Sequence, residues 1–265
     1  MRTNDVAAPG RPAVERAYRL IAVVLLVAAA FVWIDLYQIV DSHRYGFAVD
    51  FNQYQAHTTR WLETGQLYLA RQLAGPTPVQ DGDPLYPPIV LYLLLPFRVL
   101  PSILWWVIPL AIIGSVIVWL RPRSWTWPLL ALILLWPRTP ALIYYGNPGM
   151  WVDAAIAGGV VLGWPSVFVL IKPSLAIYAP LGIRRRSWWV ALGILAIASL
   201  PFGTLWVDYA TVLRNSGVPP WYSLLDLPLS LAPVIAWLGR GTPGRGIAPP
   251  WQGLATPFRW RARPD

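Results

Sequence analysis

Long stretches without charge constrain this chain more than any other feature of its sequence. The segments Leu20–Ile34 and Ser102–Leu120 contain no charged residue. A helix needs about 20 apolar residues to cross a bilayer, and each stretch reaches that length or nearly so with its flanks. Only 12% of the residues are charged, whereas soluble globular chains typically carry about 25%. The sequence therefore predicts an integral membrane protein with several crossings.

Prolines interrupt most of the later apolar segments. These segments lie at about 86–97, 102–120, 125–136, 150–163, 164–183, 188–206 and 223–239. Broken helices persist in a bilayer only where protein or a water-filled cavity covers the freed backbone groups. We therefore predict an all-α bundle in which residues 1–239 form one membrane domain, with broken or re-entrant helices around an internal polar site.

The cysteine, histidine and arginine content limits which metals and macromolecules the chain is expected to bind. The chain has no cysteine and two histidines, which offers no thiolate or histidine metal site, and we predict none. The net charge of +9 comes from arginines near apolar segments, which favours contact with membrane lipids over nucleic acid. Residues 240–265 are rich in Gly, Pro and Arg and are predicted to form a disordered, basic cytoplasmic tail.

The distribution of arginine predicts the orientation of the chain. Four arginines precede Leu20, so the positive-inside rule places the N-terminus in the cytoplasm and the loop 41–84 outside. We interpret Leu20–Val40 as an uncleaved anchor and not a secretion signal, because further apolar segments follow. If 86–97 does not cross and 164–183 folds as a hairpin at Lys172–Pro173, most arginines become cytoplasmic. Asp50, Asn147 and Lys172 then meet on the outer side.

The predicted outer loop contains a candidate site. As a helix from Asp50 to about Glu63, it would carry Asp50, Tyr54, His57 and Trp61 on one face. A carboxylate, a phenol and an imidazole on one stripe suit a site that binds a polyol and moves a proton. The competing interpretation is structural: Asp50 followed by Gln53 also matches a helix N-cap with its capping-box partner.

The sequence gives weaker indications that other acidic residues belong to a functional site. Asp81 and Asp83 flank Gly82, a pattern typical of a turn, although together with Asp50 they would permit a divalent cation. Asp35 and Asp153 lie in or near apolar segments. For each of them, a structural hydrogen bond and a role in a functional site are equally compatible with the sequence.

Lys172 is the only lysine of the chain. It stands between Ile171 and Pro173 in the otherwise apolar run VFVLIKPSLAIYAPLG. A lysine at that depth costs a few kcal/mol unless it faces water, a partner or a ligand. Lys172 is therefore a candidate binding residue.

Several of these elements together resemble glycosyltransferase family 87, a group of GT-C membrane enzymes that use polyprenyl-phosphate sugars, typically mannose. The resemblance covers about residues 45–195 and rests on the order and spacing of Asp50-Phe51-x-x-Tyr54, Gly65, Tyr68, Tyr86-Pro87-Pro88, Pro96, Pro101, Gly146-Asn147, Lys172-Pro173 and Arg184-Arg185-Arg186. Members of the family are usually longer in the C-terminal half, so the resemblance implies a shortened relative.

The resemblance implies roles for individual residues. Asp50 matches the acidic residue of the first outer loop, the expected general base, and Lys172 matches the lysine expected to contact the donor phosphate. Tyr86 and Asn147 belong to elements that match the family and are expected to bind substrate. Tyr54 and His57 are expected to contact the sugar or phosphate because of their place on the predicted helical face, and not because of the resemblance. No cofactor is expected, although a divalent cation would be compatible. The partners are a polyprenyl-phosphate sugar, a glycolipid or glycan acceptor and membrane lipids.

Three functional hypotheses follow. The first is a multi-pass membrane glycosyltransferase that transfers a sugar, expected to be mannose, to a lipid or glycan hydroxyl on the outer face of the cell membrane. The second is a non-catalytic translocator or binding subunit for lipid-linked sugars. The third is a membrane scaffold with interfacial aromatic residues.

Overall fold

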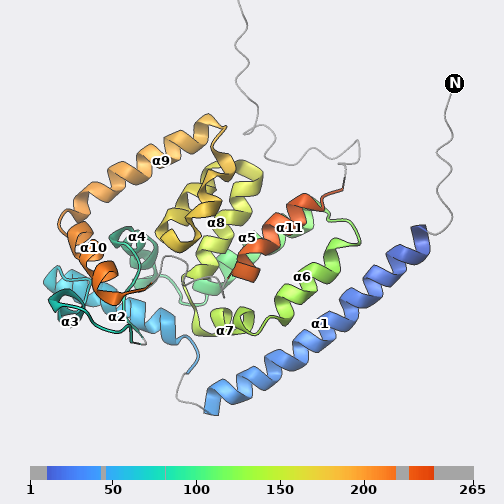
Figure 1. The fold of residues 1–265 in the computed structure, drawn as a ribbon, viewed down its shortest axis with the longest axis horizontal. Coiled ribbons are helices and arrows are strands. Elements are labelled where there is room, and N and C mark those ends of the chain that lie inside the picture. The colour runs from blue at the N-terminus through green and yellow to red at the C-terminus, as the bar shows by residue number, and fades with distance from the viewer. Residues whose placement is uncertain (1–10, 43–45, 81, 219–226, 242–265) are drawn as a thin grey trace, which may run out of the picture.

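The computed structural model describes residues 11–42, 46–80, 82–218 and 227–241, which are helical and contain no strand (Figure 1). The α-helices are α1 (Arg11–Ser42), α2 (Val49–Thr64), α3 (Ala70–Ala74), α4 (Leu91–Leu94), α5 (Leu104–Leu120), α6 (Thr126–Leu135), α7 (Arg138–Tyr145), α8 (Gly149–Leu162), α9 (Arg186–Ser199), α10 (Leu205–Ser216) and α11 (Leu227–Leu238). The 3-10 segments are η1 (Pro88–Val90), η2 (Leu95–Arg98), η3 (Trp164–Ile171), η4 (Pro173–Gly182) and η5 (Leu200–Phe202). The prediction of an all-α fold is confirmed for these residues.

One helix is long and apolar enough to cross a membrane by itself, namely the part of α1 from Pro12 to Tyr37. Two helix pairs have the necessary length only if both members are counted together. The pair α6–α7 is bent by 61° and the pair formed by α9–η5 and α10 by 91°. The described residues thus hold one to three candidate spans, which indicates a membrane protein.

Helix α1 runs along one side of the bundle and packs on α6 (Figure 1). The alanines Ala22 and Ala29 are buried on its inner face, where small side chains allow two helices to approach closely. The indole N–H of Trp33 donates to the carbonyl oxygen of Leu134 at 2.8 Å. Most other side chains of α1 are exposed and apolar, as expected for a helix in contact with lipid.

Residues 164–182 fold back on themselves. Gly182 lies so close to Gly163 that a Cβ atom on Gly182 would stand 2.3 Å from the Gly163 carbonyl oxygen. The hydroxyl of Ser166 donates to the carbonyl oxygen of Ala179 at 2.8 Å. Since η3 and η4 are held together at these points, Lys172 occupies the bend at the opposite end. This is the hairpin that the arginine distribution predicts.

The hairpin and the neighbouring helices give the bundle two distinct ends. At one end, the amide of Arg123 donates to the carbonyl oxygen of Gly239 at 2.8 Å, and the amide of Gly241 donates to the carbonyl oxygen of Arg121 at 3.2 Å. There the Arg185 guanidinium also donates to the carbonyl of Val161 at 2.8 Å. We call this the arginine end. Of the predicted tail 240–265, Arg240 and Gly241 belong to it, and residues 242–265 lie outside the described part.

The opposite end gathers the N-terminal ends of α2, α5 and α8. The amide of Ala48 donates to the carbonyl oxygen of Tyr144 at 3.0 Å. The indole N–H of Trp105 donates to the carbonyl oxygen of Gly146 at 2.8 Å. Helix α5 therefore joins the two ends, from Trp105 to Arg121. We call this second end the site end, because the candidate residues meet there.

Candidate functional site

Asn147 lies at the centre of the site end, between α7 and α8. Its side-chain oxygen accepts hydrogen bonds from the Gly149 amide at 2.8 Å and from the Tyr86 hydroxyl at 3.2 Å. A backbone amide only donates, so the atom that faces Gly149 must be the oxygen. The side-chain nitrogen consequently faces Asp50 and donates to its Oδ2 at 2.6 Å. One amide thus connects two predicted site residues from distant parts of the chain.

Gly146 makes this position of Asn147 available. Helix α7 ends there in the left-handed conformation, with φ of 70°, which glycine adopts without strain. A Cβ atom on Gly146 would stand 2.7 Å from Trp106 and 3.0 Å from Phe51. The backbone turn therefore brings Asn147 close to α2, and no larger residue fits at the turn.

Asp50 lies in the first turn of α2, as predicted, but it does not cap the helix. The N-cap is Ala48, with φ of 65° and no side-chain hydrogen bond. The capping-box interpretation is wrong, because the carboxylate of Asp50 is held across the site by Asn147 and does not turn back to its own helix. Asp50 is thereby an oriented carboxylate.

Two tyrosines and His57 continue the cluster. The ring of Tyr54 packs edge-on against Tyr86, with centroids 5.2 Å apart, and against His57 at 6.3 Å. The predicted stripe on α2 does not act as one unit, however. The Nε2 of His57 bonds the Gly82 carbonyl at 2.7 Å, and Trp61 packs on Phe202. Asp50 and Tyr54 face the site, whereas His57 anchors a loop at its edge.

Lys172 reaches the same place from the hairpin bend. Its exposed fraction is 3%. A Cβ atom on Gly149 would stand 3.0 Å from the Asn147 side-chain oxygen and 3.5 Å from the Lys172 Nζ. The ammonium and the amide oxygen therefore both lie close to the Cβ position of Gly149. The structure brings together Asp50, Tyr54, Tyr86, Asn147 and Lys172, with His57 adjoining.

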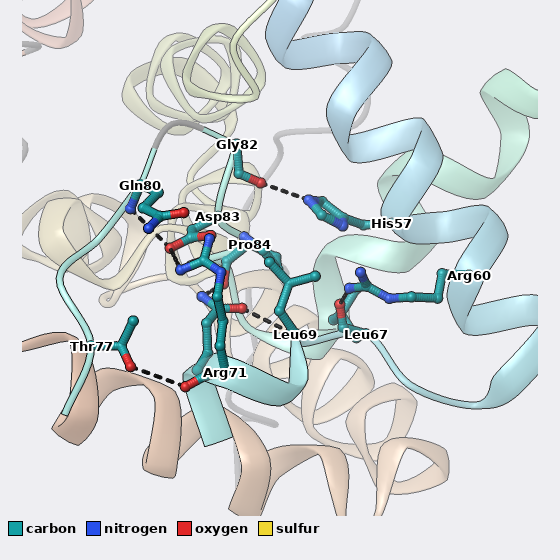
Figure 2. A network of polar contacts seen from close by, with 11 residues as sticks. His57, Arg60, Leu67, Leu69, Arg71, Thr77, Gln80, Gly82, Asp83 and Pro84 are labelled. Atoms are coloured by element: carbon teal, nitrogen blue, oxygen red, sulfur yellow. Dashed lines mark hydrogen bonds and ion pairs between the residues drawn. The ribbon is translucent and has the colours of Figure 1, made fainter. Parts of the chain in front are cut away.

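The loop beside His57 is fixed by a polar network, drawn in Figure 2. The carboxylate of Asp83 pairs with the Arg71 guanidinium through both oxygens. It also accepts a hydrogen bond of 3.0 Å from the backbone amide of Gln80. The hydroxyl of Thr77 donates to the Arg71 carbonyl at 3.0 Å. Because the Asp83 oxygens are engaged in this way, the turn interpretation holds for Asp83. Asp81 lies outside the described residues.

The described part of the chain holds no group of three or more Asp, Glu, His or Cys side chains arranged for a metal ion. This finding does not test the divalent cation that Asp50, Asp81 and Asp83 would permit, because Asp81 lies outside the described residues.

His57 should make stability depend on pH. Burial, partly offset by the hydrogen bond to Gly82, lowers its pKa below the usual 6.5. Between the two pKa values the unfolded chain binds more protons, so stability is complete above pH 6.5 and falls as the pH drops. We expect His57→Gln, which keeps a donor for Gly82, to lose less thermal stability than the wild type between pH 7.5 and 5.5. Parallel losses would contradict this.

An apolar cavity of about 690 Å³ adjoins the site. It is lined by α8, η3, α9 and the segment after Tyr86, including Ile89, Trp151, Phe168, Ile171 and Leu195. Ile171 directly precedes Lys172, and Trp151 follows Asn147 by one helical turn. One part of the cavity wall therefore begins where the polar cluster ends.

Trp151 is a candidate that the sequence did not indicate. Its ring lines the cavity, and its buried indole nitrogen has no hydrogen-bond partner among the described residues. Buried donors are nearly always paired, so this N–H is available to a ligand. No sequence signal distinguished it, because the chain has 17 tryptophans.

Comparisons of the chain with protein-family models, with curated proteins and with solved structures find no match.

Proposed function

We propose that this protein is a membrane glycosyltransferase that moves a sugar, expected to be mannose, from a polyprenyl-phosphate carrier to a hydroxyl of a lipid or glycan. The proposal keeps the resemblance to glycosyltransferase family 87 as its starting point. It assigns Asp50 as general base and Lys172 as the contact for the donor phosphate.

One observation carries the proposal. Asn147 holds the Asp50 carboxylate, and the buried ammonium of Lys172 lies, like the Asn147 oxygen, close to Gly149, beside an apolar cavity of about 690 Å³. A lipid-linked phosphate has an apolar chain, an anionic group and a sugar in that order. The cavity, Lys172 and Asp50 offer a complementary surface for each of these parts in the same order.

The proposed reaction is a single displacement. The acceptor oxygen attacks the anomeric carbon while the bond from that carbon to the phosphate oxygen breaks, and the bonding electrons leave with the lipid phosphate. Asp50 takes the proton of the acceptor hydroxyl, since a positioned carboxylate makes this weak nucleophile reactive. Lys172 stabilises the charge that develops on the phosphate. The configuration at the anomeric carbon is inverted.

The site end is proposed to face outward and the arginine end to face the cytoplasm. The arginine distribution supports this orientation, because Arg121, Arg123, Arg185 and Arg240 gather at the end opposite Asp50. The protein has no cysteine, so single introduced cysteines report their location cleanly.

We expect a thiol reagent that does not cross membranes to label Gln66→Cys in intact cells. Arg184→Cys should be labelled only after the cells are permeabilised. Both positions are exposed, so a difference in labelling reflects the side of the membrane. The reverse pattern would contradict the proposed orientation.

Gly149→Ala should impair donor use without unfolding the protein. The backbone at Gly149 is helical and accepts alanine, but the methyl group would stand 3.0 Å from the Asn147 oxygen and 3.2 Å from Leu142. We expect kcat/KM to fall about tenfold, because small displacements of positioning groups slow catalysis strongly. Gly193→Ala is the matched control, since nothing lies within 4 Å of its Cβ position.

The direct test is transfer of labelled mannose from polyprenyl-phosphate mannose by the purified protein in lipid vesicles, with glycolipid acceptors and water as alternatives. Release of polyprenyl phosphate together with a new glycoside supports the proposal. Movement of the intact donor across the bilayer without release would favour the non-catalytic translocator. If neither occurs with any of several polyprenyl-phosphate sugars, the glycosyltransferase proposal fails.

A further inference from the structure

The apolar cavity beside the site has a floor of buried residues. Val152, Ala154 and Gly158 line it from α8, and Ile171 lines it from η3. All four are buried. Helix α8 and η3 pack directly on each other, and a Cβ atom on Gly158 would stand 3.0 Å from Pro165. None of the residues that line the cavity is charged, so its floor suits an apolar ligand.

The rim of the cavity, in contrast, is exposed. Ile112 of α5 and Ile194 of α9 both line the cavity, yet their exposed fractions are 37% and 60%. Tyr92 and Trp164, which also line it, are exposed as well. Helix α5 packs on α8 and α9 packs on η3, so these two helices flank the floor. The cavity is therefore open on the side where Ile112 and Ile194 stand.

The surface around this opening is apolar. Val107 and Leu110 of α5 and Val190 and Ile197 of α9 are exposed, and α5 contains no charged residue. In a membrane protein, exposed apolar helix faces of this kind contact lipid chains. Water is a poor occupant of the cavity, because it needs polar partners that an apolar wall does not provide.

We propose that the opening faces the hydrocarbon core of the bilayer and that a chain of a membrane lipid enters the cavity sideways, between Ile112 and Ile194. In the resting protein the occupant is an acyl chain of a bilayer phospholipid, which a substrate must displace. Occupancy by a phospholipid chain stands without the proposed function, whereas entry of the lipid-linked sugar by the same route rests on it.

The chain by itself gives little selectivity. Lipid tails are as apolar as the side chains of the cavity, so transfer from the bilayer into the cavity has no hydrophobic driving force. The head group must therefore decide which lipid stays. Ile171 lines the cavity and directly precedes Lys172, whose side chain is buried. A lipid whose chain ends directly in a phosphate can reach this ammonium, whereas the glycerol of a phospholipid holds its phosphate further from the chain.

Occupancy is tested by native mass spectrometry of the full chain after incorporation into phosphatidylcholine nanodiscs and release in mild detergent. The wild type should carry a bound phosphatidylcholine. Ala198→Phe should lose it, because Ala198 lines the cavity and the phenyl ring would fill the space. Ala196→Phe is the matched control, since Ala196 is exposed on the same helix and does not line the cavity. Equal lipid binding by the two variants would overturn the occupancy, as would a wild type without lipid.

The entry route is tested at the rim, where a substitution does not disturb the core. Ile194→Trp should narrow the opening and slow the exchange of the bound lipid for deuterated phosphatidylcholine several-fold. Ile197→Trp is the control, because Ile197 is exposed on α9 but does not line the cavity. Wild-type exchange in Ile194→Trp would overturn entry between α5 and α9.

Entry of the substrate is tested with two donors, polyprenyl-phosphate mannose and a water-soluble mannosyl phosphate with a short alkyl chain. Ala198→Phe should lower kcat/KM for the long-chain donor about tenfold more than for the short one, because a displaced chain misplaces the phosphate. Equal effects on both donors would overturn substrate entry and leave a phospholipid site. If lipid binding responds as expected but no protein transfers sugar from either donor, the proposed function fails and the lipid site stands.

Discussion

Replacement of Asp50 by asparagine is expected to reduce sugar transfer by about 10²- to 10⁴-fold, the usual contribution of a general base. Asparagine has nearly the same shape and keeps an oxygen that accepts the hydrogen bond from the Asn147 amide, which measures 2.6 Å in the wild type. The substitution thus removes the basic group while it preserves the contact between α2 and the α7–α8 turn. The measurement is kcat for labelled transfer at matched protein concentration.

Three comparisons make this result interpretable. The unfolding temperature of Asp50→Asn should stay close to that of the wild type, because the hydrogen bond remains. Binding of the donor should also be retained, since Asp50 acts on the acceptor. Asp35→Asn in the exposed part of α1 should transfer sugar at the normal rate. Wild-type turnover by Asp50→Asn would show that Asp50 is not the base.

Replacement of Lys172 by methionine is expected to lower kcat/KM for the donor by about 10²-fold, the loss typical when one group that stabilises a developing charge is removed. Methionine has a similar length and makes the hairpin more apolar, so insertion into the membrane should not suffer. Activities are compared per amount of folded protein, because the replacement of a buried side chain can also change stability. Wild-type donor kinetics in this variant would exclude a phosphate contact.

Arginine at position 172 provides a finer probe of the same role. It keeps the charge but replaces a compact ammonium by a larger planar group. The Lys172 Nζ is buried and lies 3.5 Å from the Cβ position of Gly149. We therefore expect Lys172→Arg to retain donor binding better than Lys172→Met but to lose kcat. Equal losses in the two variants would show that shape and not charge decides the role of Lys172.

Some features of the site could be predicted because their signals are local. The helix in the loop that is predicted to lie outside follows from residue spacing, and α2 extends from Val49 to Thr64, close to the predicted range 50–63. The hairpin at Lys172 follows from the requirement that arginines stay on one side. His57 illustrates the limit of such reasoning. Residue spacing predicts that it shares a helix face with Asp50, but spacing does not predict its hydrogen bond to the carbonyl oxygen of Gly82.

The sequence by itself determined the helical class, the long N-terminal helix and the separation of arginines from the candidate site, because hydropathy, spacing and charge are properties of short segments. Only the tertiary structure decided that Asn147 holds Asp50 across 97 residues of sequence and that an apolar cavity adjoins the site. These features depend on how closely segments distant in sequence approach one another. Packing of complementary side chains sets that approach, and no single segment encodes it.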